Sequence, residues 1–179
     1  PRRGSTLEKM ATLKTVLEGG RHSAAACSQI SDGAAALILA DSETASASPT
    51  SVKVRAISQV NDYLPMSRRD MSRLEGCEQA WQLVLKRAEL TLNDLSLVET
   101  HDCFTVAELM QYEAMGLTPY GKGANAIREG WTYRDGRLPV NLSGGLKSKG
   151  HPIGATGVSM HVVAAMQLSG RAGDMELPN

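Results

Sequence analysis

The glycine-rich stretch at residues 141–157 (Asn-Leu-Ser-Gly-Gly-Leu-Lys-Ser-Lys-Gly-His-Pro-Ile-Gly-Ala-Thr-Gly) contains the side chain best placed for chemistry. His151 lies between Gly150 and Pro152, and a small-residue helix is expected over residues 153–168. Proline is favoured at a first helical position, because its missing N–H would have no partner there. The positive end of the helix disfavours imidazolium, which predicts a neutral His151 that can act as a general base.

The same stretch has to be distinguished from a phosphate-binding loop. Gly145 and Gly150 have the required glycine spacing, but His-Pro follows where such a loop needs Lys and Ser or Thr. A nucleotide-phosphate loop is therefore excluded.

A second reactive cluster lies at residues 99–104, Glu-Thr-His-Asp-Cys-Phe. It follows an apolar run that is typical of a short buried strand and precedes a helical pattern. The carboxyl ends of strands are where α/β sheets build their sites. A neutral histidine such as His101 can raise the thiolate fraction of a nearby cysteine such as Cys103. Asp102, on the turn between them, is expected to cap the following helix or to orient a neighbour.

These clusters have to be positioned by alternating strands and helices. The residue pattern predicts helices over 6–17, 71–90, 105–115 and 153–168, and strands over 33–40, 52–60, 95–99 and 137–142. Residues 42–50 are expected to include a short helix or a linker, and residues 116–136 to form a glycine-rich loop. Strands that alternate with helices indicate an α/β fold, with a parallel or mixed sheet flanked by helices.

Composition excludes several classes of protein. The formal net charge is zero, and no basic cluster is large enough for a nucleic-acid footprint. Three cysteines without a repeating spacing argue against a disulfide framework and against a structural metal, and they favour a reducing compartment. The sequence contains no run of 18 apolar residues, so no membrane span is predicted. The expected location is cytoplasmic, or peroxisomal or mitochondrial in a eukaryote.

The two reactive clusters, in this order and at about this separation, resemble active-site loops in the C-terminal half of a thiolase. His-Asp-Cys-Phe at 101–104 is similar to the variant in the sterol-carrier-protein-2 type, where most thiolases have Asn-Glu-Ala-Phe. Gly-His-Pro at 150–152 resembles the second loop. Residues 31–36 resemble the strand that closes the N-terminal half, and residues 6–14 resemble the end of the preceding loop domain.

The resemblance implies a thiolase fold, a stacked αβαβα arrangement of which this chain supplies one incomplete half. Residues 1–48 would be the end of the loop domain and the last strand of the N-terminal half. Residues 49–179 would be the C-terminal domain without its final strands.

The resemblance also implies an acyl-CoA acyltransferase of lipid metabolism, for example fatty acid β-oxidation. It would catalyse thiolysis of a 3-ketoacyl-CoA, or the reverse Claisen condensation, through a cysteine thioester. His151, His101 and Cys103 would be catalytic. Coenzyme A thioesters would be the substrates, with no other cofactor and no metal.

Further residues would bind the substrate or coenzyme A: Ser28, Phe104, Gly144 and Gly145. Trp131 and Tyr133 could line an acyl or pantetheine channel, or they could simply anchor their loop.

One departure from the family concerns the nucleophile. The cysteine that accepts the acyl group lies in the family's N-terminal half, and neither Cys27 nor Cys77 resembles its context. The chain alone is therefore expected to be inactive, a piece of a homodimeric or tetrameric parent enzyme that requires the N-terminal half. The alternatives are a thiolase-fold relative that cleaves a CoA-linked side chain as an aldolase, and a non-catalytic CoA-binding module.

Overall fold

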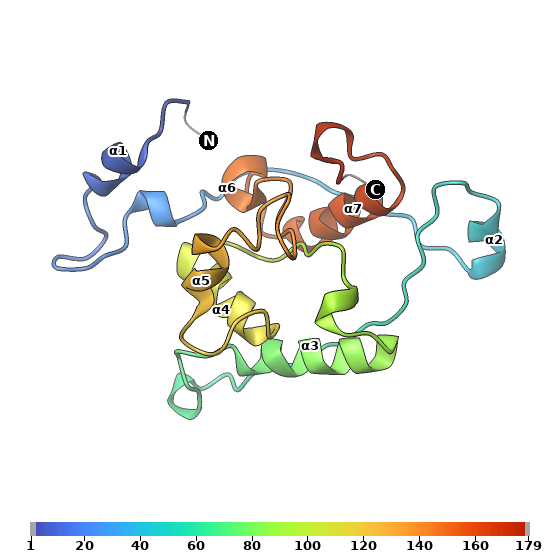
Figure 1. Cartoon of the computed structure of the whole chain (residues 1–179), viewed down its shortest axis with the longest axis horizontal. Helices are drawn as coiled ribbons and strands as arrows, with labels where there is room; N and C mark the ends of the chain where they lie inside the picture. The colour runs from blue at the N-terminus through green and yellow to red at the C-terminus, as the bar shows by residue number, and fades with distance from the viewer. Residues whose placement is uncertain (1–2, 178–179) are drawn as a thin grey trace.

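The computed structural model describes residues 3–177, which form an elongated molecule with most of its helices in the middle (Figure 1). The helices are α1 (Leu7–Ala11), α2 (Ser42–Ser46), α3 (Glu75–Ala88), α4 (Thr105–Ala114), α5 (Gly123–Arg128), α6 (Gly145–Lys149) and α7 (Thr156–Leu168). Short 3-10 turns occupy Ala24–Ala26, Met66–Arg68, Leu92–Asp94 and Gly173–Met175. In Figure 1, α1 and α2 lie at opposite ends of the molecule, while α3, α4 and α5 lie close together.

The core is built around α4 and the segments on either side of it. Tyr112 of α4 and Met115, which follows the helix, are buried. They form one cluster with five other buried apolar residues: Val98, Leu117, Ala126, Leu138 and Val140. Trp81 of α3 and Trp131 pack against this cluster from outside. Burial of aromatic and aliphatic side chains is the main stabilising contribution here.

The charged residues at the two ends of helix α3 explain where it forms. Acidic residues occupy its first turn and basic residues its last, which matches the helix macrodipole. The helix ends where Glu89 adopts a left-handed conformation with φ 56°. The predicted helix over 71–90 is therefore confirmed, although it is shorter at both ends.

Two predicted strands, 95–99 and 137–142, lie side by side in parallel. Val98 pairs with Val140, its N–H donates to the Pro139 carbonyl, and its own carbonyl accepts from the N–H of Asn141 at 2.9 Å. This pairing places the ends of both segments, and so the two reactive loops, next to each other.

The predicted mixed sheet does not form among residues 3–177. The β-pairs there are four isolated bridges, and segments 33–40 and 52–60 have no neighbouring strand. A strand depends on hydrogen bonds to a partner, so an apolar run alone does not make one. Ile38 and Leu39 are 95% and 78% exposed.

Three other predictions need correction. The helix over 6–17 is a single turn at Leu7–Ala11, and the glycine-rich loop contains α5. Helix α7 begins at Thr156 and not at Ile153, because the Pro152 carbonyl accepts from the N–H groups of Ala155 and Thr156 in a preceding turn. His151 thus lies a turn before the helix, where the macrodipole acts more weakly than predicted.

The proposed boundary between residues 1–48 and 49–179 stays a prediction. Among residues 3–177, no helix has the length and apolarity needed to cross a membrane.

Candidate active site

The two reactive loops bring His101 and His151 together. Their ring centroids are 4.9 Å apart, with the ring planes at 72°, an edge-to-face arrangement. Burial is the main cause that lowers the pKa of His101, and the nearby His151 lowers it further, while Asp102 partly offsets both. A His101 with a lowered pKa stays neutral near pH 7 and keeps one N–H for donation.

Two serines of the N-terminal segment hold His151. The Ser28 hydroxyl lies 2.9 Å from Nδ1 of the His151 ring. The Ser31 hydroxyl accepts from the backbone N–H of His151 at 2.9 Å, and the N–H of Ser31 donates to the His151 carbonyl at 3.3 Å. The ring and the backbone of His151 are therefore fixed by different side chains.

The loop glycines are required by close packing between the segments. Gly150 has φ 92°, and a Cβ there would lie 2.6 Å from the Ser31 hydroxyl. A Cβ on Gly33 would lie 2.8 Å from Cγ of Pro152. Any larger residue would push segment 31–35 away from the His151 loop.

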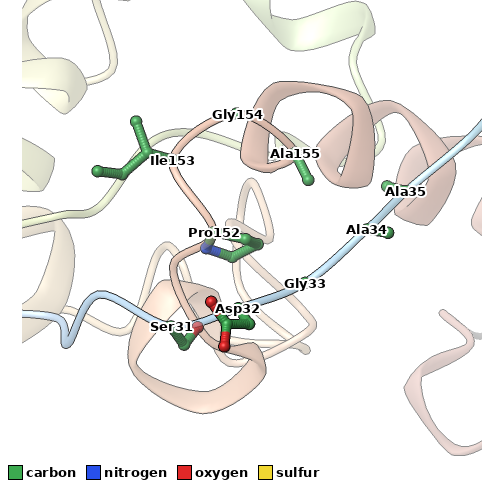
Figure 2. Close-up of a pocket in the computed structure, with 9 residues that line it drawn as sticks. All are labelled: Ser31, Asp32, Gly33, Ala34, Ala35, Pro152, Ile153, Gly154 and Ala155. Carbon is green, nitrogen blue, oxygen red and sulfur yellow. The ribbon is translucent and has the colours of Figure 1, made fainter.

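Figure 2 shows this junction, an open depression between segment 31–35 and the turn 152–155. The Pro152 ring faces Gly33, whereas Ile153 points away from the segment. The depression is continuous in sequence with the His151 loop and is lined mainly by small residues.

Asp102 connects the His101 loop to the His151 loop by a hydrogen bond. Its carboxylate accepts from the N–H of Leu146 at 2.9 Å, next to the start of α6. Gly145 has φ 65°, and a Cβ there would collide with the same carboxylate. Asp102 is therefore an orienting group, as predicted, but it acts on the Gly144-Gly145 turn and not on the helix that follows it. Gly145 is buried, and Gly144, the residue just before α6, adopts a left-handed conformation.

A buried ion pair connects the loops a second time. The Glu99 side chain is only 3% exposed, and its carboxylate lies 3.4 Å from both the Lys149 ammonium and the Ser143 hydroxyl. Burial raises the pKa of Glu99, and Lys149 partly offsets this rise. Glu99 precedes His101 by two residues and Lys149 precedes His151 by two, so the pair sets the spacing of the two histidine loops.

A polar network supports the backbone of the His101 loop. The Gln111 amide donates to the His101 carbonyl at 2.6 Å, and Gln111 also contacts the Thr100 hydroxyl. The Asn141 side chain accepts from the N–H of Thr100 at 2.8 Å. Asn141 itself has φ 52°, a conformation uncommon outside glycine and asparagine.

Cys103 and Phe104 lie at the end of the same loop. Cys103 is half-buried and free, and its carbonyl accepts from the N–H of Ser28 at 2.8 Å. Phe104 is bridged to Cys27 and is 47% exposed immediately before α4. The exposed ring is consistent with contact to a further molecule or segment.

The structure brings four of the predicted site residues into one set of direct contacts: Ser28, His101, Cys103 and His151. Gly145 lies against Asp102 of the His101 loop. Trp131 packs against the core, so it anchors its loop, while Tyr133 is 55% exposed. Sequence reasoning missed the roles of Ser31, Glu99 and Lys149. Glu99 and Lys149 lie inside the two motifs, but nothing in the sequence shows that the Glu99 side chain is buried. Ser31 lies 120 residues from His151, so no local pattern indicated their contact.

Comparison with solved structures identifies the class of fold. The chain superposes on the Ltp2–ChsH2(DUF35) aldolase with a TM-score of 0.78, over 95% of this chain and 45% of that one, at 20% sequence identity. At that identity the match shows the fold alone, which is thiolase-like.

The sequence profile described as thiolase C-terminal domain-like matches residues 58–179. The chain therefore belongs to the thiolase family, and it is similar to the sterol-carrier-protein-2 type. It is 41% identical over 153 residues to an acetyl-CoA acetyltransferase of Methanothermobacter thermautotrophicus, covering 84% of this chain and 40% of the relative. It is 38% identical over 160 residues to human sterol carrier protein 2, covering 85% of this chain and 29% of the relative.

A third relative is the benzoylsuccinyl-CoA thiolase subunit BbsB of Thauera aromatica, 31% identical over 144 residues, covering 79% of this chain and 37% of the relative. The chain thus spans less than half the length of each of these three relatives.

Proposed function

We propose that this chain is the C-terminal part of a thiolase that cleaves 3-ketoacyl-CoA, or forms it by the reverse condensation. The edge-to-face pair of His101 and His151 supports this most directly, because two distant loops bring two imidazoles and the Cys103 segment to one place. Acyl transfer needs a base, an oxyanion donor and a proton shuttle at one centre.

In the proposed reaction, His151 takes the proton of a nucleophilic cysteine that lies outside this chain. The thiolate attacks the 3-keto carbon, and the bond between C2 and C3 breaks. The electron pair left on C2 takes a proton from Cys103, which releases acetyl-CoA and leaves the shortened acyl group on the nucleophilic cysteine as a thioester. Coenzyme A then gives its thiol proton to the site and displaces the acyl group from the cysteine.

The proposed role of His101 is electrostatic. A neutral imidazole donates its N–H to the thioester oxygen where negative charge develops, together with protonated His151. The lowered pKa of His101 favours this neutral form. Coenzyme A thioesters are the proposed ligands, with Phe104, Gly144 and Gly145 beside the reacting centre.

The experiment that tests this proposal uses a chimaera, because the isolated chain is expected to show no turnover. Residues 3–177 replace the corresponding segment of the Methanothermobacter acetyltransferase, and thiolysis of acetoacetyl-CoA is followed with coenzyme A present. We expect activity that falls at least about 100-fold in His151→Ala, since general acid–base groups contribute that much. His161→Ala is the matched control, because His161 is exposed on α7 and bonds only the Gly157 carbonyl.

An aldolase is the second candidate, because the structural match is to an aldolase. It predicts side-chain cleavage that consumes no coenzyme A, and that result from the chimaera would contradict thiolysis. Turnover by the isolated chain would contradict the placement of the nucleophile outside it. A chimaera that binds coenzyme A without any turnover would favour the third reading, a binding module.

A further inference from the structure

Ser28 is the residue that hydrogen-bonds to both reactive loops. Its backbone N–H donates to the Cys103 carbonyl at 2.8 Å, and its hydroxyl lies 2.9 Å from Nδ1 of His151. The sequence resemblance also predicts that Ser28 contacts coenzyme A, and this stays a prediction. The geometry gives its hydroxyl a partner within the protein.

The position of Ser28 is set independently of His151. Cys27 is bridged to Phe104, and the Lys147 ammonium donates to the carbonyls of Ala24 and Cys27. The backbone before and at Ser28 is therefore fixed against α6 and against the start of α4. Its hydroxyl is presented to His151 from a position that the ring does not determine.

A serine hydroxyl can donate or accept, so the distance alone allows two tautomers of His151. If the hydroxyl donates, Nδ1 carries no proton and Nε2 carries it. If the hydroxyl accepts, Nδ1 carries the proton and Nε2 has the free lone pair. Only the second form can take a proton at Nε2.

We propose that Ser28 is a positioning residue that accepts a hydrogen bond from Nδ1–H of His151 and thereby keeps Nε2 as the basic nitrogen. This inference rests on the proposed function, in which His151 is the base. The arrangement also suits the protonated state, because imidazolium carries a proton on both nitrogens. Nδ1–H then keeps the same acceptor before and after proton transfer, and no group has to rotate.

Nitrogen NMR of the chain with ¹⁵N-labelled histidine tests the proposal without any enzymatic activity. Long-range ¹H–¹⁵N spectra near pH 8 distinguish Nδ1–H from Nε2–H for each of the four histidines, and single His→Gln variants assign the signals. In the wild-type chain we expect His151 to show Nδ1–H. In Ser28→Ala, the ratio should move about fivefold towards Nε2–H, the equivalent of one lost hydrogen bond.

Two further variants separate positioning from general stability. Ser28→Thr keeps the hydroxyl, so it should restore the wild-type tautomer. Ser31→Ala removes a hydroxyl that bonds the backbone of His151 and not the ring, so the tautomer should stay unchanged. In the chimaera, Ser28→Ala should lower kcat more than it raises KM.

The proposal is overturned if wild-type His151 is in the Nε2–H form, a result that no folding defect of a variant can obscure. It is also overturned if Ser28→Ala leaves the ratio unchanged, or if Ser31→Ala shifts it equally. These outcomes are distinct from a failure of the proposed function, which would appear as absent thiolysis with the His151 tautomer as expected.

Discussion

Glu108 of α4 is a half-buried carboxyl that accepts from the Tyr112 hydroxyl at 2.7 Å and from the Asn141 amide at 3.4 Å. Burial is the main cause that raises the pKa of Glu108, and the Tyr112 hydrogen bond partly offsets it. The same surroundings raise the pKa of Tyr112, so its phenol stays a donor. Since Asn141 also holds Thr100, Glu108 acts on the His101 loop through one intermediate side chain.

Replacing Glu108 by Gln should leave the fold intact and remove a pH dependence of stability. A raised pKa in the folded state contributes stability that is fully present below the unfolded pKa and is lost as pH rises through the folded pKa. Relative to wild type, Glu108→Gln should therefore have a larger free energy of unfolding, and so be more stable, at pH 7 than at pH 4. Urea unfolding at both values measures the difference.

The matched control is Glu113→Gln on the same helix, where the carboxylate accepts one backbone N–H, from Gly123, and no side-chain hydroxyl of residues 3–177. Because Glu113→Gln removes the same charge from α4, an equal gain at pH 7 in both variants would assign the effect to the charge of the helix and not to the burial of Glu108. Glu108→Ala, in contrast, leaves two donors without an acceptor and should cost about 1–3 kcal/mol. A gain for Glu108→Gln that is equal at both pH values would contradict the burial of its charge.

At the residue scale, the motifs predicted which side chains gather but not how they bond. His101, Cys103 and His151 could be selected because their neighbours are glycine, proline and a strand-to-helix turn. The partner of Ser28 could not be predicted, because a contact across 123 residues depends on how the chain folds back. Glu99 could not be singled out either, since a glutamate in a sequence does not reveal that its side chain is buried.

At the scale of the elements, the ion pair of Glu99 and Lys149 connects the two reactive loops, and both side chains are largely buried. Lys149→Met should destabilise the chain by about 3–5 kcal/mol, because it leaves the Glu99 carboxylate buried without its partner. Glu99→Met combined with Lys149→Met should cost less than the single change. Chemical denaturation of the single and double variants gives the interaction energy between the two residues.

The exposed pair of Arg73 and Glu78, at 2.7 Å, is the matched control. Its side chains are 40% and 33% exposed, so breaking it should cost at most about 1 kcal/mol. If the Lys149 and Arg73 variants lose the same stability, the Glu99 carboxylate is solvated and the loops are held by other contacts.

Element prediction succeeded where local rules were sufficient. Helices α3 and α4 have an apolar face and a distinct end, so their residues determine them. The strands predicted over 33–40 and 52–60 do not form. A strand requires a pairing partner, and the sequence of a segment does not specify whether it has one. Strands 95–99 and 137–142 succeeded in part because each has the other.

For the whole molecule, the exposed apolar segment at residues 37–39 has the largest consequence. An unpaired extended run of Leu, Ile and Leu offers backbone hydrogen bonds and apolar surface to another chain. The purified chain should self-associate with rising concentration, and Ile38→Asp should shift it towards monomer. Sedimentation velocity over a concentration series measures the change.

Leu168→Asp is the matched control, because Leu168 is 65% exposed at the end of α7 and outside this segment. It should leave the association unchanged. A wild-type chain that stays monomeric at every concentration would show that residues 37–39 do not mediate self-association.

The contact between Ser28 and His151 also determines when the site can form during folding. Closing a loop of 123 residues costs on the order of 4 kcal/mol in chain entropy before any contact there compensates it. Helices α3 and α4 are near neighbours in sequence and in space, so their contacts close much shorter loops. The helical centre is therefore expected to fold early, and His151 acquires its serine partners only in the last steps.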